Sequence, residues 1–341
     1  MIVITTDHAD HDPDRIAPSG DGRRYWERPE RIDALLATVT ARGAHIRRAP
    51  DHGLAPICRV HDAGYVDFLA KAFARYQTLP DAGPALRPHA FAVRHLNRRP
   101  DSVLGQAGYY LATLGAPILA GTWDAARGSA HAAIEAADLI IAGNRLAYAL
   151  CRPPGHHAAT DIAGGFCYLN NAAIAAQRLL DREAGPIAIL DFDVHHGNGT
   201  QQIFYARDDV HYVSTHGDPA RLYPYYAGYA DETGTGPGLG WNLNLPLPPG
   251  AKDAAFLAAV TQGLEAIAAR EPEVLVVSLG FDAHEGDPTA NLAVTTPSFR
   301  EIGARIAALG LPVLLVQEGG YLVERLSDNL TAFLDGLSGQ A

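Results

Sequence analysis

The chain has 341 residues, of which 48% are hydrophobic and 19% charged, and its net charge is −11. This composition is typical of a globular protein with a large buried core. The acidic balance argues against nucleic-acid binding, which needs basic surface, and no apolar run is long enough to span a bilayer.

The N-terminus and the cysteines predict a cytoplasmic location. The first residues, MIVITTDHADHD, turn acidic at once and lack the basic and apolar pattern of a signal peptide. Cys58, Cys151 and Cys167 are too few and too scattered for a disulfide framework or a CxxC metal motif.

Helices and a long loop are expected in the first half of the chain. Apolar residues recur at helical spacing in 27–39, and the alanine-rich segments 121–141 and 171–183 are also predicted helices. Residues 77–100 are rich in Pro, Arg and His and have no period. They predict a loop excursion that serves function or contacts.

Short apolar runs at 186–193, 273–282 and 312–321 predict buried parallel strands, because both faces of such strands are covered. Residues 145–157 are a fourth candidate strand. Helical stretches alternate with these runs. The predicted fold class is therefore α/β, with a central, mostly parallel sheet flanked by helices and a single domain over 1–341.

Chemically active residues lie at the ends of the predicted strands. Ligands of open parallel sheets bind outside the carboxyl ends of the strands, so these ends define one candidate site. The residues concerned are His156, His157, Asp191, Asp193, Asp282 and the segment from Glu318 to Tyr321.

The segment ILDFDVHHGNGT contains candidate metal ligands. Asp193 and His195 are two residues apart, so they face the same side of extended backbone, and Asp282 is a candidate third ligand. Such a set suits zinc and leaves one position open for water. In the plain structural alternative, Asp193 caps the next helix and His195 lies on the surface. His196 favours the metal, because imidazoles gather at this edge.

The pair His156–His157 lies between Pro-Pro-Gly and Gly-Gly, in a turn where both rings can converge on one target. Near neutral pH a histidine is a natural general base or acid for a water molecule at the metal. Asp191 and Asn198 are available to set the histidine tautomers. The hydroxyl of Tyr321 can polarise a carbonyl oxygen, although a packed aromatic side chain is the alternative.

Two other kinds of site are not supported. The glycine-rich segment 233–240 neither follows a strand nor opens a helix, so it is expected to be a loop rather than a dinucleotide motif. Cys151 and Cys167 lie in apolar surroundings and indicate buried thiols rather than a Cys–His nucleophile.

Together these motifs resemble the histone deacetylase superfamily, and within it the bacterial acetylpolyamine amidohydrolases, over nearly the whole chain. The resemblance implies the single-domain arginase/deacetylase-like fold, with the active site at the carboxyl ends of the strands. It also implies hydrolysis of an acetamide to acetate and an amine. The blocks that carry it are VHDAGYVDFL, GQAGYY, GTWDAA, CRPPGHHA, GGFCYLNNAAIAA, AILDFDVHHGNGTQ, STHGDP, VSLGFDAHEGDP and EGGY.

The resemblance assigns roles residue by residue. It implies Zn²⁺, with Fe²⁺ or Co²⁺ as alternatives, at the ligands Asp193, His195 and Asp282. It implies a catalytic group in which His157 is base and then acid, His156 acts electrostatically and Tyr321 polarises the carbonyl, with Asp191 and Asn198 as the partners of the histidines.

The resemblance further implies a structural cation and a substrate tunnel. The site for K⁺ or Na⁺ is expected at Asp191, Asp193, His195, Ser214 and Thr215. The tunnel lining is expected at Leu104, Gly165, Phe166 and Gly320, with Tyr168 as a further aromatic candidate.

The substrate implied by the resemblance is a small acetylated amine, with acetylpolyamines first. Relatives that act on polyamines carry glutamates where this chain has Leu104 and Gly115, so the charge partner of a distal ammonium is missing here. Asp101 lies close and is a candidate substitute. The excursion at 77–100 matches a loop that narrows the tunnel in those relatives and helps to form a dimer, so a homodimer is expected.

Several alternatives stay open. One is an acetyl-lysine protein or peptide deacetylase of the same superfamily, since GFDAHEGDP looks like the second class of eukaryotic-type deacetylases. Another is a non-catalytic protein that binds acetyl ligands, although the base and the tyrosine that it would lack are both present. An arginase-like ureohydrolase would need the acid-rich ligands of a two-metal cluster. No nucleic-acid or membrane partner is expected.

Overall fold

The structure, a computed structural model, describes residues 1–16 and 25–339. In that part of the chain, eight strands form one sheet of order β2-β1-β3-β8-β7-β4-β5-β6. All the strand pairs within this described sheet are parallel. The strands are β1 (Ile2–Thr5), β2 (His45–Arg48), β3 (Leu146–Ala149), β4 (Ile187–Asp191), β5 (Val210–Gly217), β6 (Asn242–Leu247), β7 (Val274–Leu279) and β8 (Val313–Gln317).

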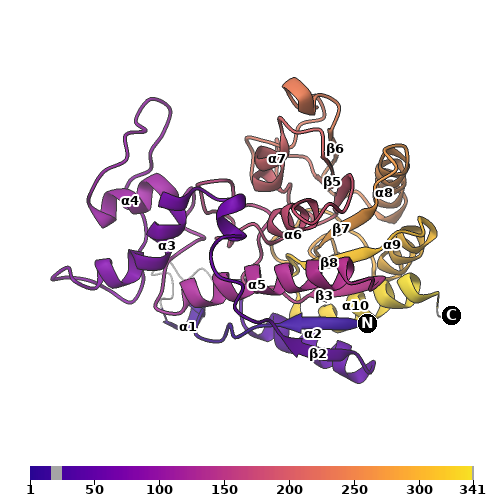
Figure 1. Cartoon of the computed structure of the whole chain (residues 1–341), viewed down its shortest axis with the longest axis horizontal. Coiled ribbons are helices and arrows are strands. Elements are labelled where there is room, and N and C mark those ends of the chain that lie inside the picture. Colours follow the sequence, from indigo (N-terminus) through magenta and orange to yellow (C-terminus); the bar gives the residue numbers. More distant parts are fainter. Residues whose placement is uncertain (17–24, 340–341) are drawn as a thin grey trace.

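Helices cover both faces of the sheet (Figure 1). Successive side chains of a strand point to opposite faces, so Ile187 and Ile189 of β4 pack in one core, while Ala188 and Leu190 pack in the other. The helices are α1 (Pro13–Ile16), α2 (Glu30–Ala41), α3 (Ala63–Tyr76), α4 (Val103–Tyr110), α5 (Thr122–Ile141), α6 (Asn171–Leu180), α7 (Asn198–Phe204), α8 (Asp253–Ala268), α9 (Thr296–Ala308) and α10 (Val323–Ser338), with 3₁₀ turns η1 (Ile57–Arg59) and η2 (Gly236–Gly238).

Each core belongs to its own set of helices. Helices α5 and α6 contribute to the core on one face, and α2, α8, α9 and α10 contribute to the core on the other. The central strands β3, β4, β7 and β8 lie between these cores and are apolar along most of their length, which is why the sequence shows them as apolar runs.

The predicted α/β class and parallel sheet are confirmed. The four predicted strands correspond to β3, β4, β7 and β8, which are consecutive neighbours in the middle of the sheet. The three predicted helices correspond to α2, α5 and α6, and the glycine-rich segment 233–240 contains only the turn η2. The sheet is wider than predicted, because β1, β2, β5 and β6 flank these strands. Strand β2 is a largely exposed edge strand, and β5 carries polar side chains, so neither has an apolar run.

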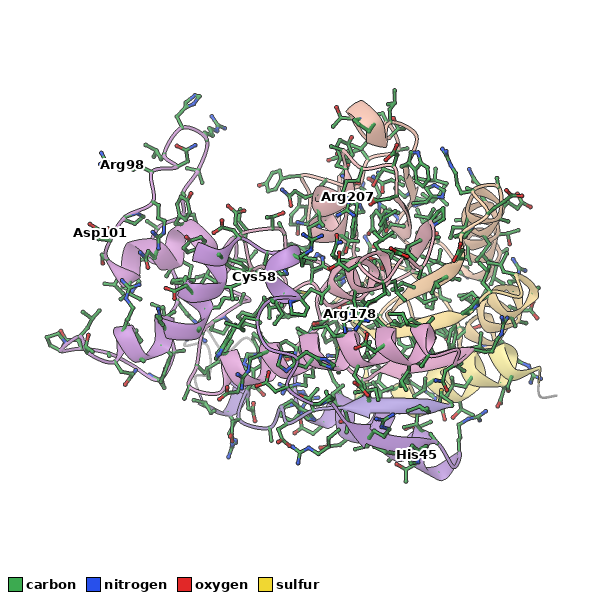
Figure 2. All side chains as sticks on the ribbon, viewed as in Figure 1. His45, Cys58, Arg98, Asp101, Arg178 and Arg207 are labelled. Carbon is green, nitrogen blue, oxygen red and sulfur yellow. The ribbon has the colours of Figure 1, made fainter. Side chains whose placement is uncertain are left out.

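Helices α3 and α4 and the segment between them form a lobe that stands away from the sheet, at the left of Figure 1. The predicted excursion lies here, and Arg98 and Asp101 mark it in Figure 2. No helix or strand interrupts residues 77–102, which the structure describes in full. Gly108 lets the excursion pack on α4, since a Cβ there would lie 1.7 Å from the carbonyl oxygen of Ala90.

No described helix combines the length and the apolar character that a membrane crossing requires.

Candidate active site

Asp193, His195 and Asp282 come together just beyond the carboxyl ends of β4 and β7. The Nδ1 atom of His195 lies 3.2 Å from Oδ1 of Asp193 and 3.2 Å from Oδ2 of Asp282. One candidate ligand atom from each of the three buried residues lies within 4.8 Å of the other two. The fold therefore brings together the three residues that the sequence predicts as metal ligands.

These residues fit a divalent cation. Asp193 and Asp282 are both fully buried, and burial together with the charge of Asp193 raises the pKa of Asp282 to about 7. The single Nδ1 proton of His195 cannot serve both carboxylates at once. Two carboxylate oxygens and an imidazole nitrogen are ligands suited to zinc, iron(II) or cobalt.

Backbone N–H groups hold the two carboxylates in place. Asp193 accepts hydrogen bonds from the N–H of His195 at 2.9 Å and of Gly319 at 2.8 Å, and Asp282 accepts one from Val194 at 2.8 Å. Position 319 has to be glycine, because a Cβ there would lie 2.1 Å from Oδ2 of Asp282 and 2.5 Å from Oδ2 of Asp193. The EGGY segment thus reaches the candidate metal ligands through its backbone.

His156 and His157 follow β3 and lie beside the same centre, with Nε2 of His156 3.8 Å from Oδ1 of Asp193. Nδ1 of His156 lies 3.0 Å from Oδ2 of Asp191, and Nδ1 of His157 lies 2.8 Å from Oδ1 of Asn198. Both partners are the ones that the sequence predicted. The turn is compact, since a Cβ at Gly155 would lie 2.4 Å from the backbone nitrogen of Asn171.

Burial and the neighbouring charges leave the two histidines in different protonation states. Burial opposes a charge on His156, but the charges of Asp191 and Asp193 outweigh it and raise the pKa of His156 to about 10. Burial, followed by the charge of His156, holds the pKa of His157 well below its usual value. At neutral pH His157 is therefore free to accept a proton, while His156 carries one.

A cavity of about 300 Å³ opens onto these groups. Gly165 forms part of its wall, and a Cβ there would lie 2.3 Å from Cδ2 of His157. The ring of Phe166 packs against those of Tyr25 at 4.9 Å and Tyr321 at 5.5 Å. The lining consists of Thr113, Gly115, His157, Gly165, Phe166, His195, Tyr223, Thr289 and Tyr321.

Tyr321 presents a protonated hydroxyl to this cavity. Burial raises the pKa of its phenol well above the usual value, so the group is a hydrogen-bond donor at neutral pH. Its backbone N–H donates to Oδ2 of Asp287 at 2.7 Å, and the guanidinium of Arg31 lies 4.7 Å from its ring. These contacts fix a side chain that would otherwise follow two glycines freely.

Three residues expected in the tunnel lie elsewhere. Leu104 is on α4 and lines a separate cavity beside the excursion. Gly320 turns its carbonyl oxygen to Nε of Arg31 at 2.6 Å, and Tyr168 is fully buried, with its hydroxyl donating to the carbonyl of Pro117 at 2.5 Å. None of the three is among the residues that line the cavity beside His157, and their place in a substrate tunnel stays a prediction.

Of the residues expected at the monovalent-cation site, Asp191, Ser214 and Thr215 lie in adjacent strands, and Asp193 and His195 follow the end of β4. Asp191 of β4 pairs with Ser214 of β5, and Thr215 follows. The Ser214 hydroxyl lies 2.8 Å from Nδ1 of His216, whereas Oγ1 of Thr215 is buried and has no hydrogen-bond partner among the described residues. An oxygen in that state suits a bound K⁺ or Na⁺.

Sequence reasoning missed several residues around the cavity. The ring of Tyr223 contacts that of His157 at 4.8 Å, and the hydroxyl of Tyr25 donates to the carbonyl of Gly115 at 2.9 Å. Both tyrosines lie outside regular elements, so no periodicity marks them. Arg31 lies in an amphipathic helix, where the sequence suggests an exposed charged residue. In the structure it is fully buried, and its Nη1 lies 2.9 Å from Oε1 of Glu27.

Comparison with known proteins gives concordant matches. The model of the histone deacetylase domain matches residues 25–337. The acetylpolyamine amidohydrolase of Burkholderia pseudomallei is 47% identical over 98% of each chain. Acetylpolyamine amidohydrolase 1 of Pseudomonas aeruginosa is 45% identical over 100% of this chain and 99% of the relative. A crystal structure of the Burkholderia pseudomallei acetylpolyamine aminohydrolase superimposes with a TM-score of 0.92 over 100% of this chain and 99% of the other, at 45% identity.

The close approach of Gly319 to both carboxylates generates a prediction. Gly319→Ala should lower the affinity for Zn²⁺ by about 10- to 100-fold, because the methyl group would displace Asp193 and Asp282. Metal content after dialysis against a competing chelator measures this. Gly83→Ala is the control, since its methyl group meets only the Tyr76 hydroxyl, at 3.6 Å. Equal Zn²⁺ affinity in Gly319→Ala and the unmodified chain would contradict the assignment.

Proposed function

The chain belongs to the histone deacetylase family, and on that premise we propose that it hydrolyses small acetylated amines, acetylpolyamines foremost, to acetate and the free amine. One observation carries the proposal: a candidate metal centre, a neutral His157 and a protonated Tyr321 meet around one cavity. The names of the relatives, which match over their full length, support the substrate class.

We assign the metal centre to Zn²⁺, held by Asp193, His195 and Asp282, with Fe²⁺ or Co²⁺ able to use the same ligands. When bound, the ion supplies Lewis acidity to a water molecule and to the acetyl carbonyl oxygen. The remaining chemistry belongs to side chains of this protein.

His157 is the proton carrier of the reaction. It is neutral at neutral pH and lines the cavity, so it accepts a proton as water adds to the acetyl carbon. It returns that proton to the amine nitrogen as the C–N bond breaks. Asn198 fixes the tautomer through Nδ1, which leaves Nε2 as the working atom.

His156 and Tyr321 stabilise the charge that develops on the acetyl oxygen. The Tyr321 hydroxyl donates a hydrogen bond to that oxygen, and burial keeps this phenol protonated. His156 carries its charge beside Asp191 and acts electrostatically, without giving up its proton.

The cavity supports a slender substrate. Glycine occupies positions 115 and 165, and the rings of Phe166 and Tyr223 form apolar walls. Such a lining suits the methylene chain of an acetylated diamine. It offers no carboxylate to a distant second ammonium, because none of the residues that line it is acidic.

We also propose that residues 1–341 form one deacetylase domain and that the protein works in the cytoplasm.

We further propose that the chain forms a homodimer. The contact is made by the excursion lobe, which comprises α3, α4 and the segment between them (residues 63–110). The exposed Phe91, Val93 and Leu96 support this assembly, Leu96 being 74% exposed. A dimer is expected in analytical ultracentrifugation at micromolar concentration, and a monomer there would contradict it.

A structural K⁺ or Na⁺ at Asp191, Asp193, His195, Ser214 and Thr215 is part of the same proposal, supported by the unpartnered hydroxyl of Thr215. Added KCl should then raise the unfolding temperature more than an equal concentration of tetramethylammonium chloride. Equal effects of the two salts would exclude the site.

Acetate release from a panel of substrates tests the function. Acetylputrescine and acetylcadaverine should be hydrolysed with the highest kcat/KM, followed by acetylspermidine and then an acetyl-lysine peptide. Gly115→Glu is the matched variant, since its Cβ would meet Phe166 and Thr113 at ordinary contact distances of 3.5 Å. This variant should have a higher kcat/KM for acetylspermidine than the unmodified chain. A clear preference for the peptide would support the acetyl-lysine deacetylase instead, and no acetate release from any member would refute the proposal.

Tyr321→Phe tests the mechanism. Removing the hydroxyl should lower kcat by about 100-fold or more, because one donor to the developing oxyanion is lost. The fold should be retained, since the ring contacts with Phe166 and Arg31 do not need the hydroxyl. Steady-state kinetics and circular dichroism check both outcomes, and an unchanged kcat would refute the role of Tyr321.

A further inference from the structure

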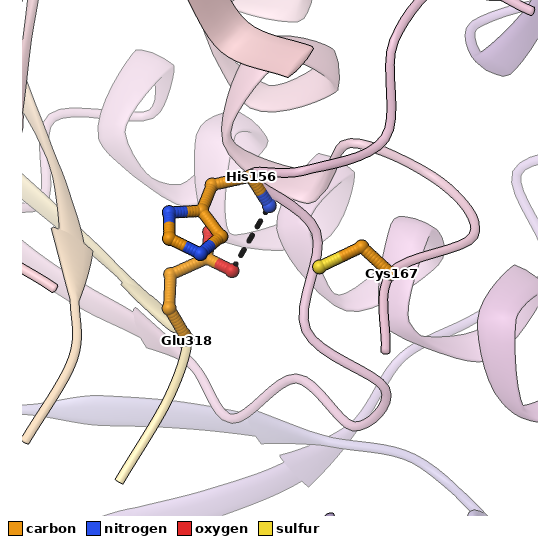
Figure 3. A group of neighbouring side chains, drawn as sticks. All are labelled: His156, Cys167 and Glu318. Atoms are coloured by element: carbon orange, nitrogen blue, oxygen red, sulfur yellow. Dashed lines mark hydrogen bonds between the residues drawn. The ribbon is translucent and has the colours of Figure 1, made fainter. Parts of the chain in front are cut away.

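Glu318 is a fully buried carboxylate at the end of β8 to which the mechanism above assigns no role. It lies beside His156 and Cys167, and one potential metal-binding atom from each lies within 4.8 Å of the others (Figure 3). These three side chains are not suited to a second metal site. Oε2 of Glu318 is already occupied by two backbone donors, and burial raises the pKa of the Cys167 thiol, so it stays protonated.

The two donors belong to the turn of the catalytic histidines. Oε2 of Glu318 accepts hydrogen bonds from the backbone N–H of Gly155 at 2.7 Å and of His156 at 3.1 Å. The latter bond is the dashed line in Figure 3. On the other side of His156, its carbonyl oxygen accepts from Gly199 at 3.0 Å and Thr200 at 3.1 Å, at the start of α7. The peptide groups on both sides of His156 are therefore fixed, one by α7 and one by Glu318.

The backbone of Glu318 is part of the turn that carries Tyr321. The guanidinium of Arg31 donates to the carbonyl oxygens of Glu318 at 2.5 Å and of Gly320 at 2.6 Å. Gly319 between them donates to Asp193. This turn is thus held on both sides, and Tyr321 leaves it in a set direction. Glu318 connects two turns: its backbone belongs to the tyrosine turn (residues 318–321), and its side chain binds the histidine turn (residues 155–157).

We propose that Glu318 is a positioning residue that sets the histidine pair and Tyr321 at the separation that the reaction needs. Its side chain anchors the histidine turn, while its backbone continues into the tyrosine turn. The inference rests on the proposed function, and it adds a residue that touches neither the cavity nor the candidate metal ligands with its side chain.

The chemistry of the anchor predicts which substitutions preserve it. Two N–H donors need an acceptor oxygen, which Gln also provides, and the amide NH₂ of Gln can donate to Ser278, whose Oγ lies 3.4 Å from Oε1. Alanine would leave two buried N–H groups without an acceptor, and the turn would shift to find one. Glu318→Gln should thus largely keep the geometry that Glu318→Ala loses.

The test compares kcat, KM, zinc content and unfolding temperature for acetylputrescine hydrolysis by the full chain and its variants. Glu318→Ala should lower kcat by about 10- to 100-fold, since small misplacements of catalytic groups have effects of that size. KM should stay within about threefold, because Glu318 does not line the cavity. Zinc content should be unchanged, and Glu318→Gln should recover kcat to within about fivefold.

Asp253→Ala is the matched control for general destabilisation. Its carboxylate also accepts from a backbone N–H, that of Thr295 at 2.7 Å, and from the Ser298 hydroxyl at 2.7 Å, at the start of α9. This variant should lower the unfolding temperature and leave kcat unchanged.

Three results would overturn the inference: an unchanged kcat in Glu318→Ala, a kcat in Glu318→Gln as low as in Glu318→Ala, or loss of zinc from Glu318→Ala. An unmodified chain that releases no acetate would instead contradict the proposed function, so the two failures are distinguishable.

Discussion

The structure depends on the burial of four carboxylates at one edge of a parallel sheet. Asp191, Asp193, Asp282 and Glu318 are all fully buried. A buried carboxylate is unfavourable unless hydrogen bonds or opposite charges compensate it. Backbone N–H groups and His156 provide part of that compensation, and we propose that a bound cation provides the rest. The two histidines differ in protonation as a result. His156 is charged beside Asp191 and Asp193, whereas burial and the charge of His156 keep His157 neutral.

The order of the strands brings the buried carboxylates and the histidine pair together at one edge of the sheet. β3, β8, β7 and β4 are neighbours, so the histidine turn, the tyrosine turn and the candidate metal ligands leave the sheet side by side. Arg31 and Glu318 then link segments that are far apart in the sequence. Arg31 holds the tyrosine turn from α2, and Glu318 holds the histidine turn from β8. The geometry of the candidate active site is therefore a property of the sheet edge as a whole.

The sequence predicted the parts of this arrangement that leave a pattern. Apolar runs marked the central strands, and polar residues at their ends marked Asp193, His195 and Asp282, because the carboxyl ends of parallel strands meet. Tertiary contacts without a local pattern could not be predicted. Tyr223 lines the cavity from an irregular loop. Arg31 is fully buried, although a charged residue of a surface helix is normally exposed. The side-chain direction of Leu104 depends on how α4 packs against the excursion, which spacing along the chain does not specify.

Our central proposal is that Asp193, His195 and Asp282 hold one divalent cation that hydrolysis requires. The most direct measurement removes metal with a chelator, dialyses the chelator away and titrates Zn²⁺ back while acetate release from acetylputrescine is followed. The account predicts that the metal-free protein releases no acetate and that activity returns in full at one Zn²⁺ per chain. Full activity in the metal-free protein would contradict it.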